Sequence, residues 1–122
     1  MIEESANVVL IVDGDLGFVM WLGYALIAAG FQALPATSAE GAIYVVETMR
    51  IAHVDLLIID PDLPGSRHLR EWLARSGPFK LITIGTPETA AEAMIERPAR
   101  GAPPSPRDYV DTVRRVIDNG GQ

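Results

Sequence analysis

Two uninterrupted apolar runs in this sequence, Val8–Val12 and Leu56–Ile59, each end in an aspartate, Asp13 after the first and Asp60 after the second. A carboxylate can hold a hard divalent cation or act as a nucleophile. The carboxyl ends of parallel strands meet at one edge of a sheet, which is where open α/β folds bind their ligands. We therefore expect Asp13 and Asp60 to form a site. The plainer alternative is that Asp60 only caps a loop.

A second aspartate follows each of these two at a distance of two residues, Asp15 in the first case and Asp62 in the second. Each of them could add an oxygen atom to the site, be solvated, or cap the helix that follows. The other metal-ligating side chains offer little. His53 and His68 are isolated and read as surface residues. The chain has no cysteine, which excludes a thiolate metal site.

The elements that must position the aspartates alternate between apolar strands and helices. Besides the two runs above, we expect strands at residues 31–36 and 81–84, and helices at residues 16–29, 37–51, 66–76, 86–95 and from Ser105 onward. Strands that are apolar along their whole length are buried on both faces, which is typical of a parallel sheet covered by helices. The prolines between Arg97 and Pro104 leave that stretch unassigned.

Composition limits the class of protein. The chain has 122 residues, 48% of them hydrophobic and 21% charged, which is typical of one globular domain. A formal net charge of -6 argues against direct binding of nucleic acid, which needs a basic surface. The N-terminus has no basic segment of a signal peptide, and the longest uncharged apolar stretch, residues 16–31, is shorter than the roughly 20 residues that span a membrane. We expect a cytoplasmic protein that does not enter a membrane.

Residues 8–15 and 55–65 together resemble the receiver domains of bacterial response regulators, the phosphorylated modules of two-component signalling. The first stretch is similar to their first strand and acidic pocket, and the second to their third strand, phospho-acceptor and Pro-Gly loop. The resemblance implies an α/β, flavodoxin-like (βα)5 fold over residues 1–122, with a doubly wound parallel sheet of five strands in the order 2-1-3-4-5. The segment after residue 85 is a few residues short, so the fourth helix and fifth strand are expected to be shortened or irregular.

The same resemblance implies a role for each aspartate. Asp60 would accept the phosphoryl group, and Mg²⁺ would be held by Asp60, by Asp13 or Asp15, and by the backbone carbonyl of Asp62. A lysine and a hydroxyl would then bind the phosphoryl group and bias a two-state surface. The chain would be a response regulator in a phosphorelay and not an ordinary enzyme. Its partner would be a sensor histidine kinase or a phosphotransfer protein.

Three positions depart from the receiver pattern. Gly14 stands at the second position of the acidic pair, so the magnesium site is expected to be weakened. Gly85 stands where the switch hydroxyl belongs, with Thr86 one residue later. Matching the family's Lys-Pro pair to Pro103 leaves Ala102 in place of the lysine. Matching it to residues 97–98 instead makes the preceding segment far too short, and we reject that alignment.

These departures support a second hypothesis, a degenerate pseudo-receiver that acts without phosphorylation as an interaction or dimerisation module. A third is an enzyme. The Asp-x-Asp pattern after each strand is similar to the nucleophile motif of haloacid-dehalogenase-like phosphatases, which also form an aspartyl phosphate. Those enzymes need a lysine and a further acidic pair downstream. Lys80 is the chain's single lysine, and no such pair follows a strand.

The first helix is unusual because no charged residue lies between Asp15 and Glu40. A surface helix should carry polar groups on its outer face. The resemblance assigns the core-facing positions to Val19, Leu22, Ala25 and Leu26, and the outward ones to Met20, Gly23, Tyr24, Ile27 and Ala28. An exposed apolar patch usually marks an interface. We predict that Met20, Tyr24 and Ile27 contact a partner or a second copy in a homodimer. Alternatively, the chain's own termini cover this face, or it is simply exposed.

Overall fold

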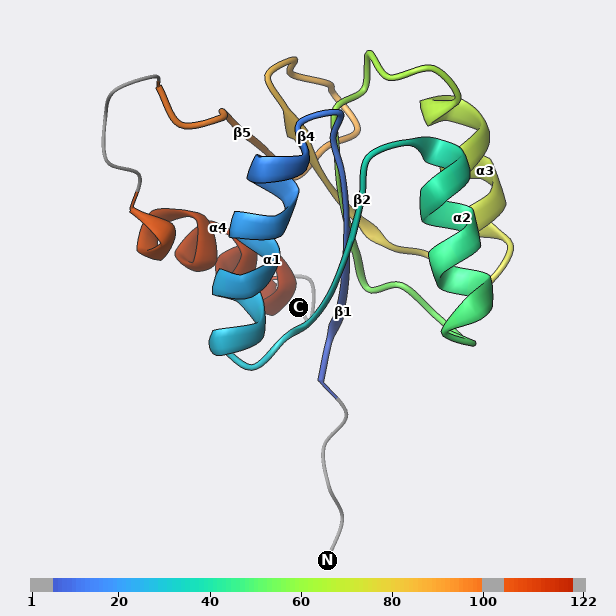
Figure 1. Cartoon of the computed structure of the whole chain (residues 1–122), viewed down its shortest axis with the longest axis horizontal. Helices are drawn as coiled ribbons and strands as arrows, with labels where there is room; N and C mark the ends of the chain where they lie inside the picture. Colours follow the sequence, from blue (N-terminus) through green and yellow to red (C-terminus); the bar gives the residue numbers. More distant parts are fainter. Residues whose placement is uncertain (1–5, 100–104, 120–122) are drawn as a thin grey trace, which may run out of the picture.

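A computed structural model describes residues 6–99 and 105–119 (Figure 1). Its elements, in chain order, are β1 (Val8–Val12), α1 (Leu16–Ala28), β2 (Gln32–Ala36), α2 (Ala39–Thr48), β3 (Leu56–Ile59), α3 (Ser66–Ala74), β4 (Lys80–Ile84), β5 (Ala93–Ile95) and α4 (Pro106–Asn119). Across these described residues, no helix is both long and apolar enough to span a bilayer.

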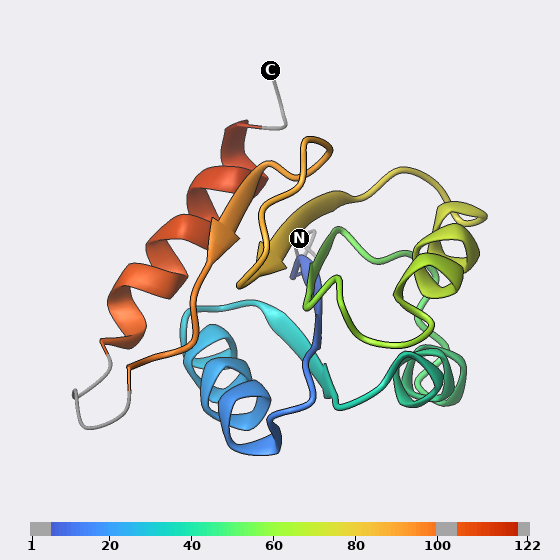
Figure 2. The same cartoon turned by 90° about the horizontal axis from the view of Figure 1, so that it is seen from above.

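The strands form one parallel sheet in the order β2-β1-β3-β4-β5. Figure 2 shows α1 and α4 on one face of the sheet and α2 and α3 on the other. The expected flavodoxin-like architecture and its strand order are therefore confirmed.

The core lies in two layers, one on each side of the sheet. Leu10 and Leu57 point toward α2 and α3, whereas Ile11 and Ile58 point toward α1 and α4. Because successive strand residues point to opposite faces and both faces are covered, every residue of β1 and β3 is buried. The two strands that carry the aspartates at their ends are therefore enclosed on both faces of the sheet.

The helix predicted at residues 86–95 is wrong. Residues 85–92 form an irregular connection, and the chain then enters the short strand β5. Thr86 and Pro87 look like a helix start, but even a two-turn helix takes about seven residues. The connection is too short to hold such a helix together with the turns at either end. The expectation of a shortened region before the fifth strand is confirmed.

Hydrogen bonds hold this connection in its irregular path. Gly85 donates its backbone N–H to the Ile95 carbonyl at 2.9 Å. Glu92 donates its backbone N–H to the Leu81 carbonyl at 2.8 Å. Arg70 of α3 pairs with Glu88 at 2.9 Å, which ties the middle of the connection to the helix beside it.

Candidate functional site

Asp13 and Asp60 lie side by side at the carboxyl edge of the sheet. Val12, the last residue of β1, stands in register with Ile59, the last residue of β3. The residue that follows each strand is an aspartate, so the two aspartates are neighbours. The Asp13 side chain is fully buried, whereas that of Asp60 is 19% exposed. Burying a carboxylate costs free energy unless a charge or hydrogen-bond donors compensate it. The site must therefore contain a compensating group.

That group is Arg97, which follows β5 by two residues. Its Nε atom donates to Asp13 Oδ2 at 2.9 Å, and its Nη2 atom donates both to Asp13 Oδ1 and, at 3.0 Å, to Asp60 Oδ2. The hydrogen bond to Asp13 raises the pKa of the Arg97 guanidinium above its ordinary value, with a smaller contribution from Asp60, although burial opposes the shift. The guanidinium thus bridges the two carboxylates with its charge fully retained.

Sequence reasoning missed Arg97 because it rejected the Arg97-Pro98 alignment on length. The structure shows why that length is short: the helix that normally fills the preceding segment is absent, so β5 begins early. Ala102, the residue assigned to the lysine position, lies outside the described residues. The signal that could have identified Arg97 is the short apolar run Ala93–Ile95, directly upstream of an Arg-Pro pair.

The side chains of Asp15 and Asp62 accept hydrogen bonds from nearby groups outside the pair Asp13 and Asp60. Asp15 is the N-cap of α1, and its Oδ1 atom accepts the backbone N–H of Phe18 at 3.1 Å. Asp62 donates its backbone N–H to Asp60 Oδ1 at 2.9 Å and accepts the Thr86 hydroxyl on Oδ2 at 3.0 Å. Of the options that the sequence left open for Asp15, the structure selects the helix cap.

Gly85 cannot simply be replaced by the hydroxyl residue that receivers carry. Its φ of +80° lies in the left-handed region, where an L-amino acid is strained. A Cβ atom at this position would also stand 3.8 Å from Arg97 Nη1. That distance is an ordinary van der Waals contact, so the strained φ, and not a lack of space, disfavours a side chain at position 85.

The residues present do not fit a bound magnesium ion in this arrangement. Gly14 contributes no ligand, Asp15 is turned toward its helix, and the guanidinium occupies the space between the two remaining carboxylates. Over the part of the chain that the structure describes, no cluster of three or more His, Asp or Glu side chains is arranged to hold a metal. A divalent cation would have to displace Arg97 to reach both carboxylates.

The outer face of α1 is apolar, as the sequence indicates. Tyr24 is 65% exposed and Ile27 is 53% exposed. Met20 is only partly exposed because it packs against the core. The outward placement of Gly23 is wrong: this residue is buried, and its missing Cβ faces Ile11 and Pro35. A Cβ atom at position 23 would stand 3.9 Å from side-chain atoms of Ile11 and Pro35, an ordinary van der Waals distance.

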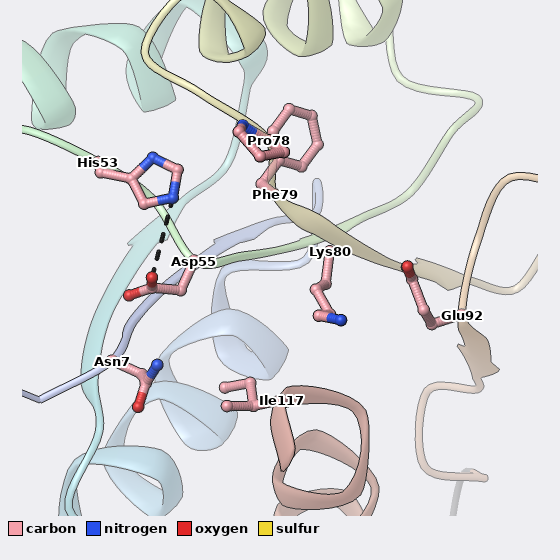
Figure 3. A pocket seen from close by; sticks show the side chains of 8 residues that line it. All are labelled: Asn7, His53, Asp55, Pro78, Phe79, Lys80, Glu92 and Ile117. Carbon is pink, nitrogen blue, oxygen red and sulfur yellow. Dashed lines mark ion pairs between the residues drawn. The ribbon is translucent and has the colours of Figure 1, made fainter. Parts of the chain in front are cut away.

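A mixed-charge cavity of about 550 Å³ lies at the opposite, amino end of the strands (Figure 3). Its two carboxylates are already engaged, since Asp55 accepts from Val8 N at 2.7 Å and Glu92 from Leu81 N at 2.6 Å. Lys80 lines this cavity at the start of β4. The chain's single lysine therefore does not serve the aspartate site, which leaves the phosphatase hypothesis without its lysine.

Comparisons with known proteins find relatives through structure only. No protein-family model matches the sequence, and no curated protein matches it. Among solved structures, a CheY-like response regulator receiver domain from Methanospirillum hungatei JF-1 superposes with a TM-score of 0.71 at 23% identity, covering 94% of this chain and 96% of that one. The chain has the receiver-domain fold.

Two further matches extend the comparison of this receiver-like chain. The receiver domain of the hybrid histidine kinase CckA has a TM-score of 0.70 at 21% identity, over 91% of this chain and 99% of that one. CheY6 of R. sphaeroides, in a complex with the phosphorylated P1 domain of CheA3, gives a TM-score of 0.67 at 16% identity, over 93% and 99% of the two chains. Identities this low establish the fold and leave the chemistry to the residues of the site.

Proposed function

We propose that this chain is a receiver domain that accepts a phosphoryl group on Asp60 and signals through protein-protein contacts. The observation that supports this function best is the position of Arg97, whose guanidinium lies 3.0 Å from the Asp60 carboxylate at the carboxyl edge of the sheet. Receivers carry a lysine after their fifth strand for the phosphoryl group, and Arg97 follows β5. We therefore propose that Arg97 binds the phosphoryl group in place of that lysine.

Arginine suits this role because its planar group binds phosphate through two parallel N–H donors. In the transfer, an Asp60 carboxylate oxygen forms a bond to phosphorus while the bond from phosphorus to the donor's leaving atom breaks, and the leaving atom keeps the electron pair. Negative charge on the phosphoryl oxygens opposes the approach of the carboxylate. The guanidinium lowers this repulsion and then binds the transferred group. Asp62 N, which donates to Asp60 Oδ1, orients the nucleophile.

The proposed partner is a sensor histidine kinase or a phosphotransfer protein, met in the cytoplasm. One of the similar structures is CheY6 bound to a phosphorylated P1 domain, which supports a partner of this kind for the present fold. On this chain, we propose the apolar face of α1 around Tyr24 and Ile27, with the partly exposed Met20 at its edge, as the contact surface. Use of the same face in a homodimer is the alternative.

A pseudo-receiver is the second candidate, and one observation favours it. Arg97 already compensates the buried Asp13 and reaches Asp60, while Gly14 removes a magnesium ligand. Such a site is complete without phosphorylation. The module would then act only through its surfaces, whatever the state of Asp60.

Incubation with acetyl phosphate or phosphoramidate, followed by intact-mass spectrometry, separates the two candidates. A receiver gains the mass of one phosphoryl group in the wild type and none in Asp60→Asn, and Arg97→Met reacts far more slowly than Arg97→Lys. Reactions with and without Mg²⁺ show whether the phosphoryl transfer requires a divalent cation. If the wild type stays unmodified with both donors, and beryllium fluoride leaves its amide NMR spectrum unchanged, the pseudo-receiver function holds.

A further inference from the structure

We propose that Tyr109 is a positioning residue for Arg97, and that it couples the aspartate site to a cluster of aromatic rings between α1 and α4. We call this cluster, formed by Phe18, Trp21 and Tyr109, the aromatic cluster. Its coupling to the site does not depend on phosphorylation; its use in signalling rests on the function proposed above.

The first step is the backbone that carries Arg97. The ladder between β4 and β5 ends at the pair of Ile84 and Ile95, so Glu96 and Arg97 lie beyond it. The Glu96 carbonyl accepts the Tyr109 hydroxyl at 2.5 Å. Tyr109 belongs to α4, so this bond fixes the residue before Arg97 from the helix side. It keeps the guanidinium within reach of both aspartates.

The second step is the setting of the Tyr109 ring. It meets the Trp21 ring edge-on, with 5.3 Å between centroids, and the Phe18 ring at 6.0 Å. Edge-to-face contacts of this kind depend on ring orientation. Burial raises the pKa of the Tyr109 phenol, and the carboxylates of Glu96 and Asp108 raise it further, so the hydroxyl stays a donor at neutral pH.

The third step is the consequence of moving Arg97. Under this proposal, a change of charge at Asp60 that redirects the guanidinium also shifts the backbone of Arg97, and with it the Glu96 carbonyl in the preceding peptide bond. The Tyr109 hydroxyl must follow that carbonyl or lose its partner. Either response alters the contact with Trp21 on α1, the helix that carries the proposed partner face.

In receivers, a hydroxyl that binds the phosphoryl group links the site to the surface. The corresponding positions of this chain do not offer a free hydroxyl, so another residue must make that link. Gly85 has no side chain, and the Thr86 hydroxyl is bonded to Asp62. Tyr109 instead links the residue after the fifth strand to the helix that follows it. The site is thereby connected to α1 and α4.

Trp21 fluorescence measures this coupling directly, in a Trp72→Phe background so that one indole emits. We expect Arg97→Met to shift the Trp21 emission maximum. In Tyr109→Phe, which keeps the ring but removes the hydroxyl, the same Arg97 substitution should leave the emission unchanged. The urea midpoints should also be non-additive, the double variant losing less than the sum of the two single losses. Tyr44→Phe, an exposed tyrosine on α2, is the matched control and should leave the Arg97 response intact.

An equal emission shift on Arg97→Met with and without the Tyr109 hydroxyl would overturn the coupling, and so would no shift in either background. The test uses no phosphoryl donor, so it stands apart from the proposed function. If the Trp21 emission shifts on Arg97→Met, and only with the Tyr109 hydroxyl present, but does not change on addition of beryllium fluoride, the positioning role is supported and phosphorylation is rejected. If beryllium fluoride shifts the Trp21 emission equally in the wild type and in Tyr109→Phe, phosphorylation is supported and coupling through the Tyr109 hydroxyl is rejected.

Discussion

Removal of the bridging guanidinium by Arg97→Met should destabilise the fold, because Asp13 is then left buried without a compensating charge. Methionine keeps much of the aliphatic stem and removes only the charged head. The effect therefore reports the loss of the two carboxylate contacts more than a loss of packing. Leaving Asp60 without the guanidinium should cost less free energy than leaving Asp13 without it, because the Asp60 side chain is partly exposed and water can solvate it.

The expected loss lies between two limits. Breaking a fully buried ion pair costs about 3–5 kcal/mol, whereas an exposed pair contributes about 0–1 kcal/mol. Here Asp13 is fully buried but the Arg97 side chain is 39% exposed, so water screens part of the interaction. We expect a loss of about 2 kcal/mol. With about 4 °C per kcal/mol for a domain of this size, Tm should fall by about 8 °C.

Urea unfolding followed by circular dichroism measures this loss, and two further variants test its cause. Asp13→Asn combined with Arg97→Met should recover about half of it, because the amide carries no charge and its oxygen can still accept from Asp15 N. Arg67→Met, which removes an exposed arginine on α3, should leave stability unchanged. The reasoning is refuted if Arg97→Met is as stable as the wild type, or if adding Asp13→Asn lowers stability further.

Three other outcomes follow from the structure. Gly85→Ala or Gly85→Ser should lower the free energy of unfolding by about 1–2 kcal/mol, since each forces an L-residue into φ +80°; urea midpoints equal to the wild type would contradict this. The raised pKa of Tyr109 means that the folded state holds its proton more tightly than the unfolded state. That contribution is fully present below about pH 10 and lost as pH rises through the raised pKa. Tyr109→Phe should therefore flatten the alkaline fall in urea midpoint. Tyr24→Ser with Ile27→Ser should keep the wild-type Tm yet lose binding to a partner kinase or to a second copy in ultracentrifugation, whereas the equally exposed Tyr44→Ser should keep both.

The parts of the fold that could be predicted are those with local signals. The runs at β1 and β3 are apolar throughout, so their burial on both faces follows from composition alone. The strand order came from the resemblance to receivers, because periodicity does not specify which strands are neighbours. The positions of Asp13 and Asp60 at strand ends likewise needed only the two runs and the parallel arrangement.

The parts that could not be predicted depend on contacts far apart in the chain. Thr86 and Pro87 carry the local signals of a helix start, but the distance to β5 overrides them. β5 itself is too short to show a strand period. Whether Arg97 or a later residue follows the last strand depends on whether a helix precedes it. The short run Ala93–Ile95 before the Arg-Pro pair is a local signal for Arg97, but that run alone does not show that the preceding helix is missing.

The bridge between Asp13 and Arg97 also bears on how the sheet opens. It joins residues that follow β1 and β5, two strands that are not neighbours, and it spans 84 positions of the chain. β5 has three residues and pairs along one side only, so few backbone hydrogen bonds hold it. Local opening of such an edge strand costs less than global unfolding. Hydrogen exchange at the β5 amides should thus report the occupancy of the aspartates: any cation or phosphoryl group that releases Arg97 would speed exchange at a strand it never touches.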